Sequence, residues 1–171
     1  MSSLQELLDR SGLVRGEPAA TIVDGRPRVY VHAGQVYASS VSTEVVTILG
    51  SCVAICLYDW ARGIGGLNHF MLPTESTTPS PRYVRHATDM LLEQLVAMGA
   101  SRSRLVAKLF GGAAVLKMGE GAVDLGSRNV EAARARLAQE RIPIAAECVG
   151  GDRGRKLSFI TSDGSARIKQ V

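Results

Sequence analysis

The sequence contains few cysteines, few aromatic side chains and no long apolar segment. Of its 171 residues only three are cysteines, and an odd number argues against a disulfide framework and suits a reducing compartment. No run of about 18 or more apolar residues occurs, so no membrane span is expected. The N-terminus has neither the basic segment nor the apolar core of a secretory signal. We therefore expect a cytoplasmic protein that does not insert into a membrane.

The composition is that of a folded domain with a small basic surplus. Hydrophobic residues make up 46% of the chain, which excludes a disordered protein. Twenty basic residues against 16 acidic ones give a net charge of +4. This surplus fits an acidic protein partner, a nucleic acid or solubility alone. Neither a Walker motif nor a GxGxxG motif is present, so nucleotide binding has little support.

The pattern of apolar residues predicts a single α+β domain. Residues 1–20 carry one short helical stripe and are expected to form a loosely ordered appendage, and residues 21–171 form the domain. Strands outnumber helices too far for regular βαβ winding, so the strands should be mostly antiparallel or mixed, with two main helices. The expected elements besides the central ones are a hairpin about Asp24–Gly25, a strand at Gln35–Ala38, a helix from Tyr83 to Met98 ended by Gly99, a strand at Leu105–Phe110, a helix from Arg128 to Gln139 capped by Ser127, a strand at Ile144–Val149 and a hairpin about Asp163–Gly164.

The longest apolar run spans Val45 to Tyr58, and its β-branched residues predict one buried strand. A second strand is expected at Ile64–Met71. If the two pair as an antiparallel hairpin centred between Trp60 and Ala61, partner numbers sum to 121, and Cys52 lies opposite His69. Cross-strand partners share a face with Cβ atoms about 4.5–5.5 Å apart. A β-bulge would shift this register by one residue.

A thiol beside an imidazole is a nucleophile for acyl carbons. The imidazole removes the thiol proton, or holds the thiolate as an ion pair, and later protonates the leaving group. The alternative is that Cys52 is an inert core residue, as most cysteines in apolar strands are. Cys56 should share the face of Cys52, where we expect it to pack in the core and to take no part in the chemistry.

Three further features of the sequence are weaker indications of function. A metal site built from Cys52, Cys56, His69 and Cys148 has little support, because Cys-x3-Cys on a strand is not a zinc-binding pattern. The basic loop at residues 150–156 lacks the interleaved aromatics of a nucleic-acid surface. The Ser/Thr/Pro loop at residues 73–81 follows the histidine strand, and both a mobile flap and a plain surface loop fit it.

Several blocks of the sequence resemble the CheD family of chemoreceptor glutamine deamidases. The similarity runs in family order from about Gly34 to the C-terminus and leaves out residues 1–30. The blocks are Thr47-Ile-Leu-Gly-Ser-Cys-Val-Ala54, Gly66-Leu-Asn-His-Phe-Met-Leu-Pro73, Lys108-Leu-Phe-Gly-Gly-Ala113, Gly126-Ser-Arg-Asn-Val-Glu-Ala132, Ile142-Pro-Ile144 and Gly150-Gly-Asp-Arg-Gly-Arg-Lys156.

This resemblance implies a fold, an activity and a site. Members of the family share a layered α/β/β fold and deamidate glutamines on the cytoplasmic helices of chemoreceptors, and some bind a CheC-type phosphatase. The family nucleophile falls on Cys52, its histidine on His69 and a third, threonine, member on Thr47. No metal or organic cofactor is required. On a regular strand Thr47 would face away from Cys52, because an odd number of residues separates them, unless a bulge near Gly50 brings it round. Asn68 and Ser51 face the same objection.

Two other functions remain open at the level of sequence. The chain could be a non-catalytic binding module for a phosphatase or a receptor, although the presence of both Cys52 and His69 argues against that. A basic nucleic-acid binder has only the net charge in its favour.

Overall fold

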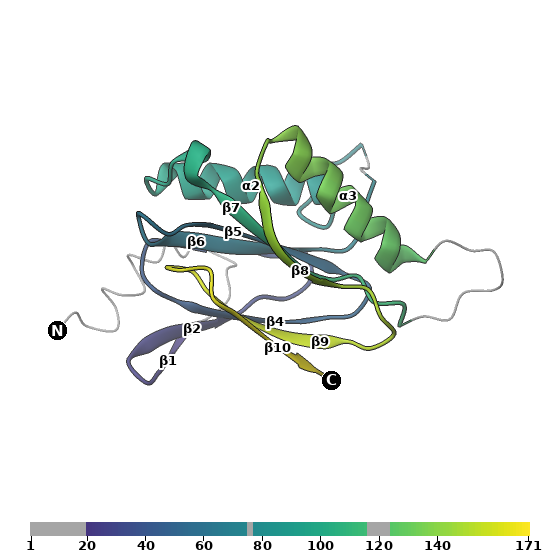
Figure 1. The fold of residues 1–171 in the computed structure, drawn as a ribbon, viewed down its shortest axis with the longest axis horizontal. Helices are drawn as coiled ribbons and strands as arrows, with labels where there is room; N and C mark the ends of the chain where they lie inside the picture. Colours follow the sequence, from purple (N-terminus) through teal and green to yellow (C-terminus); the bar gives the residue numbers. More distant parts are fainter. Residues whose placement is uncertain (1–19, 75–76, 116–123) are drawn as a thin grey trace.

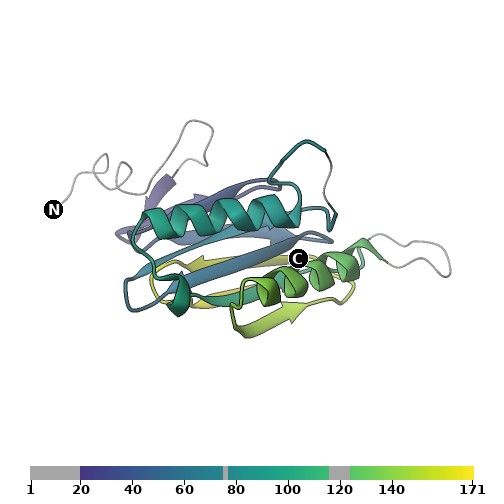
Figure 2. The same cartoon turned by 90° about the horizontal axis from the view of Figure 1, so that it is seen from above.

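The computed structural model describes residues 20–74, 77–115 and 124–171 as three layers, with two helices above two stacked five-stranded sheets (Figure 1). Both helices lie on one face of the middle layer, where Figure 2 shows them from above. The expected α+β fold with two main helices is confirmed, as is its α/β/β layering. The expected N-terminal appendage lies, except for Ala20, outside the described residues.

The middle layer, called here the central sheet, has the strand order β3-β6-β5-β7-β8. Its strands are β3 (Val36–Ser39), β5 (Val53–Asp59), β6 (Ile64–Phe70), β7 (Val106–Gly111) and β8 (Ile144–Val149). The third layer, the outer sheet, has the order β1-β2-β4-β9-β10. Its strands are β1 (Ala20–Val23), β2 (Arg26–Tyr30), β4 (Glu44–Leu49), β9 (Arg155–Ile160) and β10 (Ala166–Gln170). The helices are α2 (Val84–Ala97) and α3 (Leu125–Gln139), with a 3-10 turn at Arg102–Arg104.

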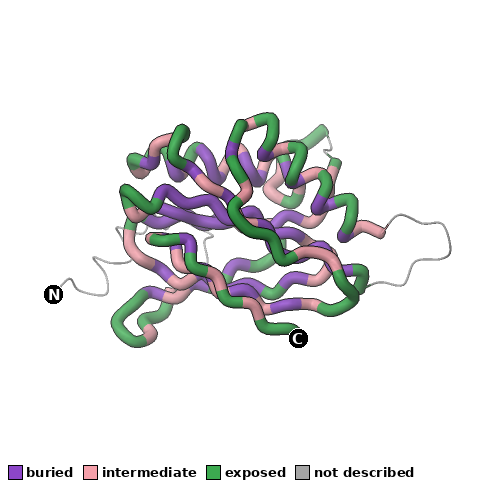
Figure 3. Tube along the Cα trace, viewed as in Figure 1, coloured by how far each residue is buried: buried purple, intermediate pink, exposed green. Residues whose placement is uncertain are grey.

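Two hydrophobic cores lie on the two faces of the central sheet. One fills the space between the helices and the sheet, and the other fills the space between the sheets. Every residue of β5 is therefore buried, in keeping with the apolar run from Val53 to Tyr58 that precedes its last residue, Asp59. In β9 buried residues alternate with half-buried ones, because the outer sheet has one face toward solvent (Figure 3). No helix in the described ranges is long and apolar enough to cross a bilayer.

The single strand expected over Val45–Tyr58 is wrong, because the run is two strands in different sheets. β4 belongs to the outer sheet and β5 to the central sheet, and the chain crosses between them at residues 50–52. The amides of Gly112 and Ala113 donate to the carbonyls of Cys52 and Gly50, both at 2.9 Å. The crossing is thus held by the end of β7, a contact that no local pattern reveals.

The β5–β6 hairpin exists, but its expected register is wrong. Ala54, not Cys52, pairs with His69, so partner numbers sum to 54 + 69 = 123 instead of 121. The turn occupies residues 60–63 and is therefore centred one residue later than expected, with Gly63 at φ +66° closing it. Glycine adopts this left-handed conformation at little cost.

The sequence predicted the ends of one helix better than those of the other. Helix α2 matches the expectation, and Gly99 follows it at φ +105°. Helix α3 begins earlier than expected, at Leu125, and its N-cap is Asp124 rather than Ser127. The Asp124 carboxylate accepts a hydrogen bond from the Ser127 amide at 2.8 Å. Aspartate and serine cap equally well, so the residue types alone do not decide between them.

Candidate active site

A pocket of about 290 Å³ opens where β2 and β4 end, at the junction of the two sheets. The three residues expected to form a site, Thr47, Cys52 and His69, all line it. Thr47 comes from the outer sheet, His69 from the central sheet, and Cys52 from the crossing between them. The objection from strand alternation therefore does not apply, because Thr47 and Cys52 are not on the same strand.

The Thr47 hydroxyl joins the imidazole to the backbone of the outer sheet. Its Oγ1 lies 2.6 Å from the carbonyl oxygen of Val31 and 2.8 Å from Nδ1 of His69. A carbonyl only accepts, so the hydroxyl donates its one proton to Val31 and must accept from Nδ1–H. The proton of the neutral imidazole is thereby assigned to Nδ1, which leaves the lone pair on Nε2.

Burial keeps both reactive groups neutral. Desolvation, together with a smaller effect of the charge of nearby His32, lowers the pKa of His69 to about 4. Burial also raises the pKa of the Cys52 thiol above its ordinary value, and the residue's own backbone N–H opposes this in part. Each charged form is disfavoured by loss of water. The resting pair near neutral pH is therefore a thiol and a neutral imidazole, not a thiolate and an imidazolium.

Cys52 and His69 are diagonal neighbours rather than direct partners. Ala54 is opposite His69 and β5 begins at Val53, so Cys52 lies one residue outside the strand and would share the face of Ala54 and His69 if the strand were continued by that residue. Diagonal neighbours are about 7–8 Å apart between Cα atoms, within reach of longer side chains. Cys52 is half-buried, while Cys56 is fully buried in the core between the sheets. The packing role expected for Cys56 fits this position.

Asn129, on α3, ties the cysteine crossing to the histidine strand. Its Nδ2 donates to the carbonyls of Ser51 and Met71, both at 2.9 Å. Ser51 precedes Cys52, and Met71 follows β6, so one fully buried amide connects both arms of the site. Sequence reasoning did not single out Asn129, although it stands inside one of the blocks that resemble the family.

Gly111 allows the backbone to pack closely against Cys52. Its φ is +107°, and a Cβ there would lie 2.3 Å from the carbonyl oxygen of Cys52. No side chain fits at that distance, so glycine is required by both conformation and space.

Two amides at the crossing donate to no other residue within the described structure. In residues 20–74, 77–115 and 124–171 no acceptor takes a hydrogen bond from the Ser51 N–H, and no acceptor in another residue takes one from the Cys52 N–H, which faces its own sulfur. Free backbone N–H groups beside a nucleophile are suited to stabilise an oxyanion.

The structure separates the remaining candidates from the pocket. Asn68 is fully buried, and its Oδ1 accepts from the Ile55 amide at 3.0 Å. Cys148 is exposed on β8, at the edge of the central sheet. Among the described residues no group of three or more His, Cys, Asp or Glu side chains could hold a metal ion. Part of the loop at 73–81 lies outside the described residues, and both expectations for it, a flap and a plain surface loop, stay predictions.

These features define a class of protein: an α/β/β fold with a thiol–imidazole pocket where its two sheets meet. Residues 71–170 match the family model described as CheD chemotactic sensory transduction. A protein of Anaeromyxobacter dehalogenans named probable chemoreceptor glutamine deamidase CheD 1 is 44% identical over 164 residues, covering 95% of each chain. The chain belongs to the CheD family. Cys52 and His69 precede the matched stretch of the family model.

Other relatives agree with this assignment. A probable chemoreceptor glutamine deamidase CheD of Trichlorobacter lovleyi is 41% identical over 145 residues, covering 82% of this chain and 90% of that protein. A protein of the same name from Burkholderia orbicola is 41% identical over 152 residues and is longer, since the match covers 85% of this chain but 61% of that protein. Among solved structures, a Neisseria meningitidis protein is similar with a TM-score of 0.47 at 13% identity, covering 82% of this chain and 76% of that one.

Proposed function

We propose that this protein is a glutamine deamidase that hydrolyses side-chain carboxamides on the cytoplasmic helices of chemoreceptors. The observation that carries the proposal is the hydrogen bond from His69 Nδ1 to Thr47 Oγ1, in a pocket that Cys52 also lines. It leaves Nε2 as the base beside a thiol. The names of the relatives supply the substrate class.

The reaction begins when Nε2 of His69 accepts the Cys52 proton as the sulfur attacks the carboxamide carbon of a bound glutamine. The C–S bond forms, and the carbonyl electrons move to oxygen. The amides of Ser51 and Cys52, which donate to no other residue of the described structure, are the candidate donors to this oxyanion. Loss of one such donor typically slows an enzyme about 100- to 1000-fold.

The intermediate then collapses to a thioester. The C–N bond breaks, and the imidazolium gives its proton to the departing nitrogen, which leaves as ammonia. The neutral imidazole next takes a proton from water, whose oxygen attacks the thioester carbon. The C–S bond breaks, the thiol regains its proton, and the product is a glutamate side chain. No step requires a metal or an organic cofactor.

Thr47 acts as a positioning residue in this scheme. The imidazolium formed in the first step has two N–H donors, and the Thr47 hydroxyl accepts from the one at Nδ1. Since Val31 takes the hydroxyl proton, the oxygen's lone pairs stay directed to the ring. This is the part that the third group of a triad plays.

The test is mass spectrometry of a receptor cytoplasmic fragment after incubation with the protein. Deamidation by the thioester route adds about one dalton per site and releases ammonia. Cys52→Ala should abolish both signals, whereas Cys148→Ala, which removes the exposed cysteine of β8, should retain them. An unchanged receptor with the wild-type protein, or equal activity of Cys52→Ala, would contradict the proposal.

A further inference from the structure

The solvent face of the outer sheet carries cations whose arrangement is uneven along the strands. The charged side chains that point outward from its strands are one carboxylate, Glu44, and five cations, Arg26, Arg28, Lys156, Arg167 and Lys169. The two ends of this face differ in charge balance, and this difference indicates which kind of partner binds beside the pocket.

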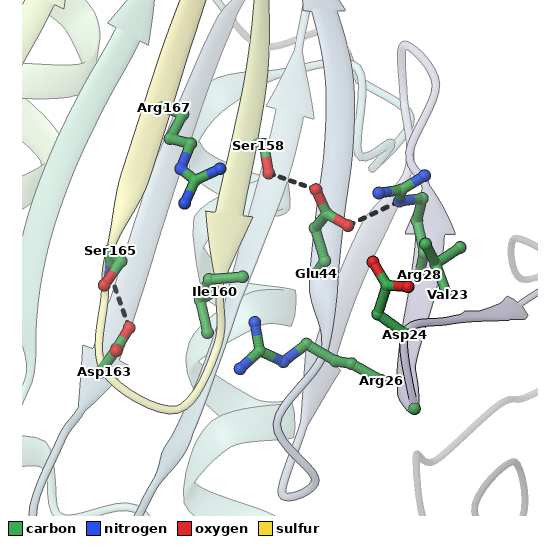
Figure 4. A pocket seen from close by; sticks show the side chains of 11 residues that line it. Val23, Asp24, Arg26, Arg28, Glu44, Ser158, Ile160, Asp163, Ser165 and Arg167 are labelled. Atoms are coloured by element: carbon green, nitrogen blue, oxygen red, sulfur yellow. Dashed lines mark hydrogen bonds and ion pairs between the residues drawn. The ribbon is translucent and has the colours of Figure 1, made fainter.

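At the end far from the pocket the charges are balanced. A hollow of about 590 Å³ opens there. Figure 4 shows that Arg26, Arg28 and Arg167 lie in it among three carboxylates, those of Asp24, Glu44 and Asp163. The side chain of Arg28 is bonded to Glu44 at 2.6 Å. This hollow therefore has no net charge to attract an ion.

At the end near the pocket the cations are unopposed. Ile48 lines the pocket and pairs across β9 with Lys156, which in turn pairs with Lys169 of β10. The three residues form one row across neighbouring strands, on the solvent face. No carboxylate in the described residues forms an ion pair with either lysine.

Two exposed apolar side chains stand at the mouth of the pocket, beside exposed His32. Ile48 is 59% exposed and Tyr30 is 43% exposed, and both line the pocket that contains Cys52 and His69. Exposed apolar side chains at the rim of a concave site are typical of a contact surface. This apolar part of the mouth thus continues directly into a row of cations.

We propose that this row, Ile48, Lys156 and Lys169, is the docking surface for an acidic helix that carries the target glutamine. The inference rests on the proposed function and adds the charge pattern of the substrate. Neighbouring strands are about 4.8 Å apart, so the two lysines stand about 5 and 10 Å from Ile48. A helix rises about 5.4 Å per turn. Carboxylates about one and two turns from the glutamine therefore meet Lys156 and Lys169, while the helix packs on Tyr30 and Ile48.

The experiment measures binding separately from catalysis. The Cys52→Ala protein is titrated with a fluorescently labelled receptor cytoplasmic fragment at 50 and 500 mM NaCl. The docking variant adds Lys156→Glu and Lys169→Glu, and Lys156→Gln with Lys169→Gln is a milder version. The control adds Arg62→Glu and Arg141→Glu, which change the net charge equally at exposed sites away from this row. Circular dichroism checks that each variant is folded.

We expect the double reversal to raise the Kd about 10- to 50-fold at low salt, with most of the difference lost at high salt, because exposed charges are screened there. The glutamine exchange should raise it about threefold to tenfold, and the control should change it less than about twofold. In the enzyme with Cys52 intact, the reversal should raise KM and leave kcat within about twofold.

Three results would overturn the docking proposal: no binding of the wild-type surface at low salt, no effect of the lysine variants, or an equal effect of the control. The deamidase proposal fails independently. If the lysine variants weaken binding as expected but the mass of the receptor never changes with Cys52 intact, the docking proposal is supported and the deamidase proposal is contradicted.

Discussion

Replacing Thr47 by valine tests the hydrogen bond on which the site is built. The side chain is 1% exposed, and valine has nearly its shape, so the change removes only the hydroxyl. Two buried partners then lose their hydrogen bond, the Val31 carbonyl and the His69 Nδ1–H. An orphaned buried polar group costs about 1–3 kcal/mol. We expect the free energy of unfolding to fall by about 2 kcal/mol, because valine also recovers some apolar burial.

The effect on the rate follows from the charge on the imidazole in the transition state. A hydrogen bond to a charged group contributes about 1.5–3 kcal/mol, and about 1.4 kcal/mol changes a rate tenfold. We therefore expect Thr47→Val to lower kcat about 10- to 100-fold. KM should stay nearly constant, because Thr47 does not contact the substrate in this scheme.

The assay is ammonia release and receptor mass shift, with a matched control in Thr43→Val. Thr43 is also fully buried, and its hydroxyl bonds to the carbonyl of Val41 at 2.8 Å, before β4 and away from the pocket. Thr43→Val should lose stability but keep kcat, and Thr47→Ser should keep most of the rate because the hydroxyl remains. Equal kcat losses in Thr43→Val and Thr47→Val, or a wild-type kcat in Thr47→Val, would refute the reasoning.

Five further outcomes are expected. Gly111→Ala should lower the free energy of unfolding by about 2–4 kcal/mol in urea denaturation, since its Cβ meets the Cys52 carbonyl at 2.3 Å and its φ is +107°. The free energy of unfolding should fall by at most about 3 kcal/mol as the pH drops from about 6.5 to 4. The reason is that the imidazole gains a proton near its ordinary pKa in the unfolded chain, whereas folded His69 stays neutral until about pH 4. If His69→Gln shows the same dependence on pH, the loss of stability belongs to other groups. The acid limb of kcat/KM should accordingly lie near pH 4 and not near 6.5. Asn129→Ala should lower kcat more than it raises KM, and Asn129→Asp should not restore the rate at neutral pH, because a carboxylate cannot donate to two carbonyls. Iodoacetamide at pH 7.5 should label exposed Cys148 before Cys52, whose thiol pKa is raised by burial, and preferential labelling of Cys52 would indicate a thiolate–imidazolium pair.

Local patterns predicted most elements, because each depends on nearby residues. The turn at Asp24–Gly25 has both residues at positive φ, as a tight hairpin requires, and helix α2 ends where Gly99 permits it. Both elements are fixed by backbone preferences and by apolar periodicity over a few residues. The hairpin expected about Asp163–Gly164 also exists, but its loop between β9 and β10 is longer, and only its glycine is at positive φ.

Features set by distant contacts were not predictable in this way. The apolar run from Val45 to Tyr58 carries no mark of its division between two sheets, since both halves are buried strands of similar composition. The division is imposed by the end of β7, whose amides bind the crossing. The role of Asn129 was equally hidden, because its two acceptors lie 58 and 78 residues away in the chain.

The change of sheet at residues 50–52 explains how one short block supplies both ends of the site. If β4 and β5 were one straight strand, Thr47 and Cys52 would point to opposite faces and could not serve one imidazole. Because the chain changes sheet, Thr47 reaches Nδ1 of His69 from the outer sheet, and Cys52 lines the same pocket from the crossing. The crossing must therefore keep its place beside the end of β6 for the site to exist. In the proposed scheme this gives the contacts of Asn129, which hold the crossing there without touching the substrate, an effect on the rate.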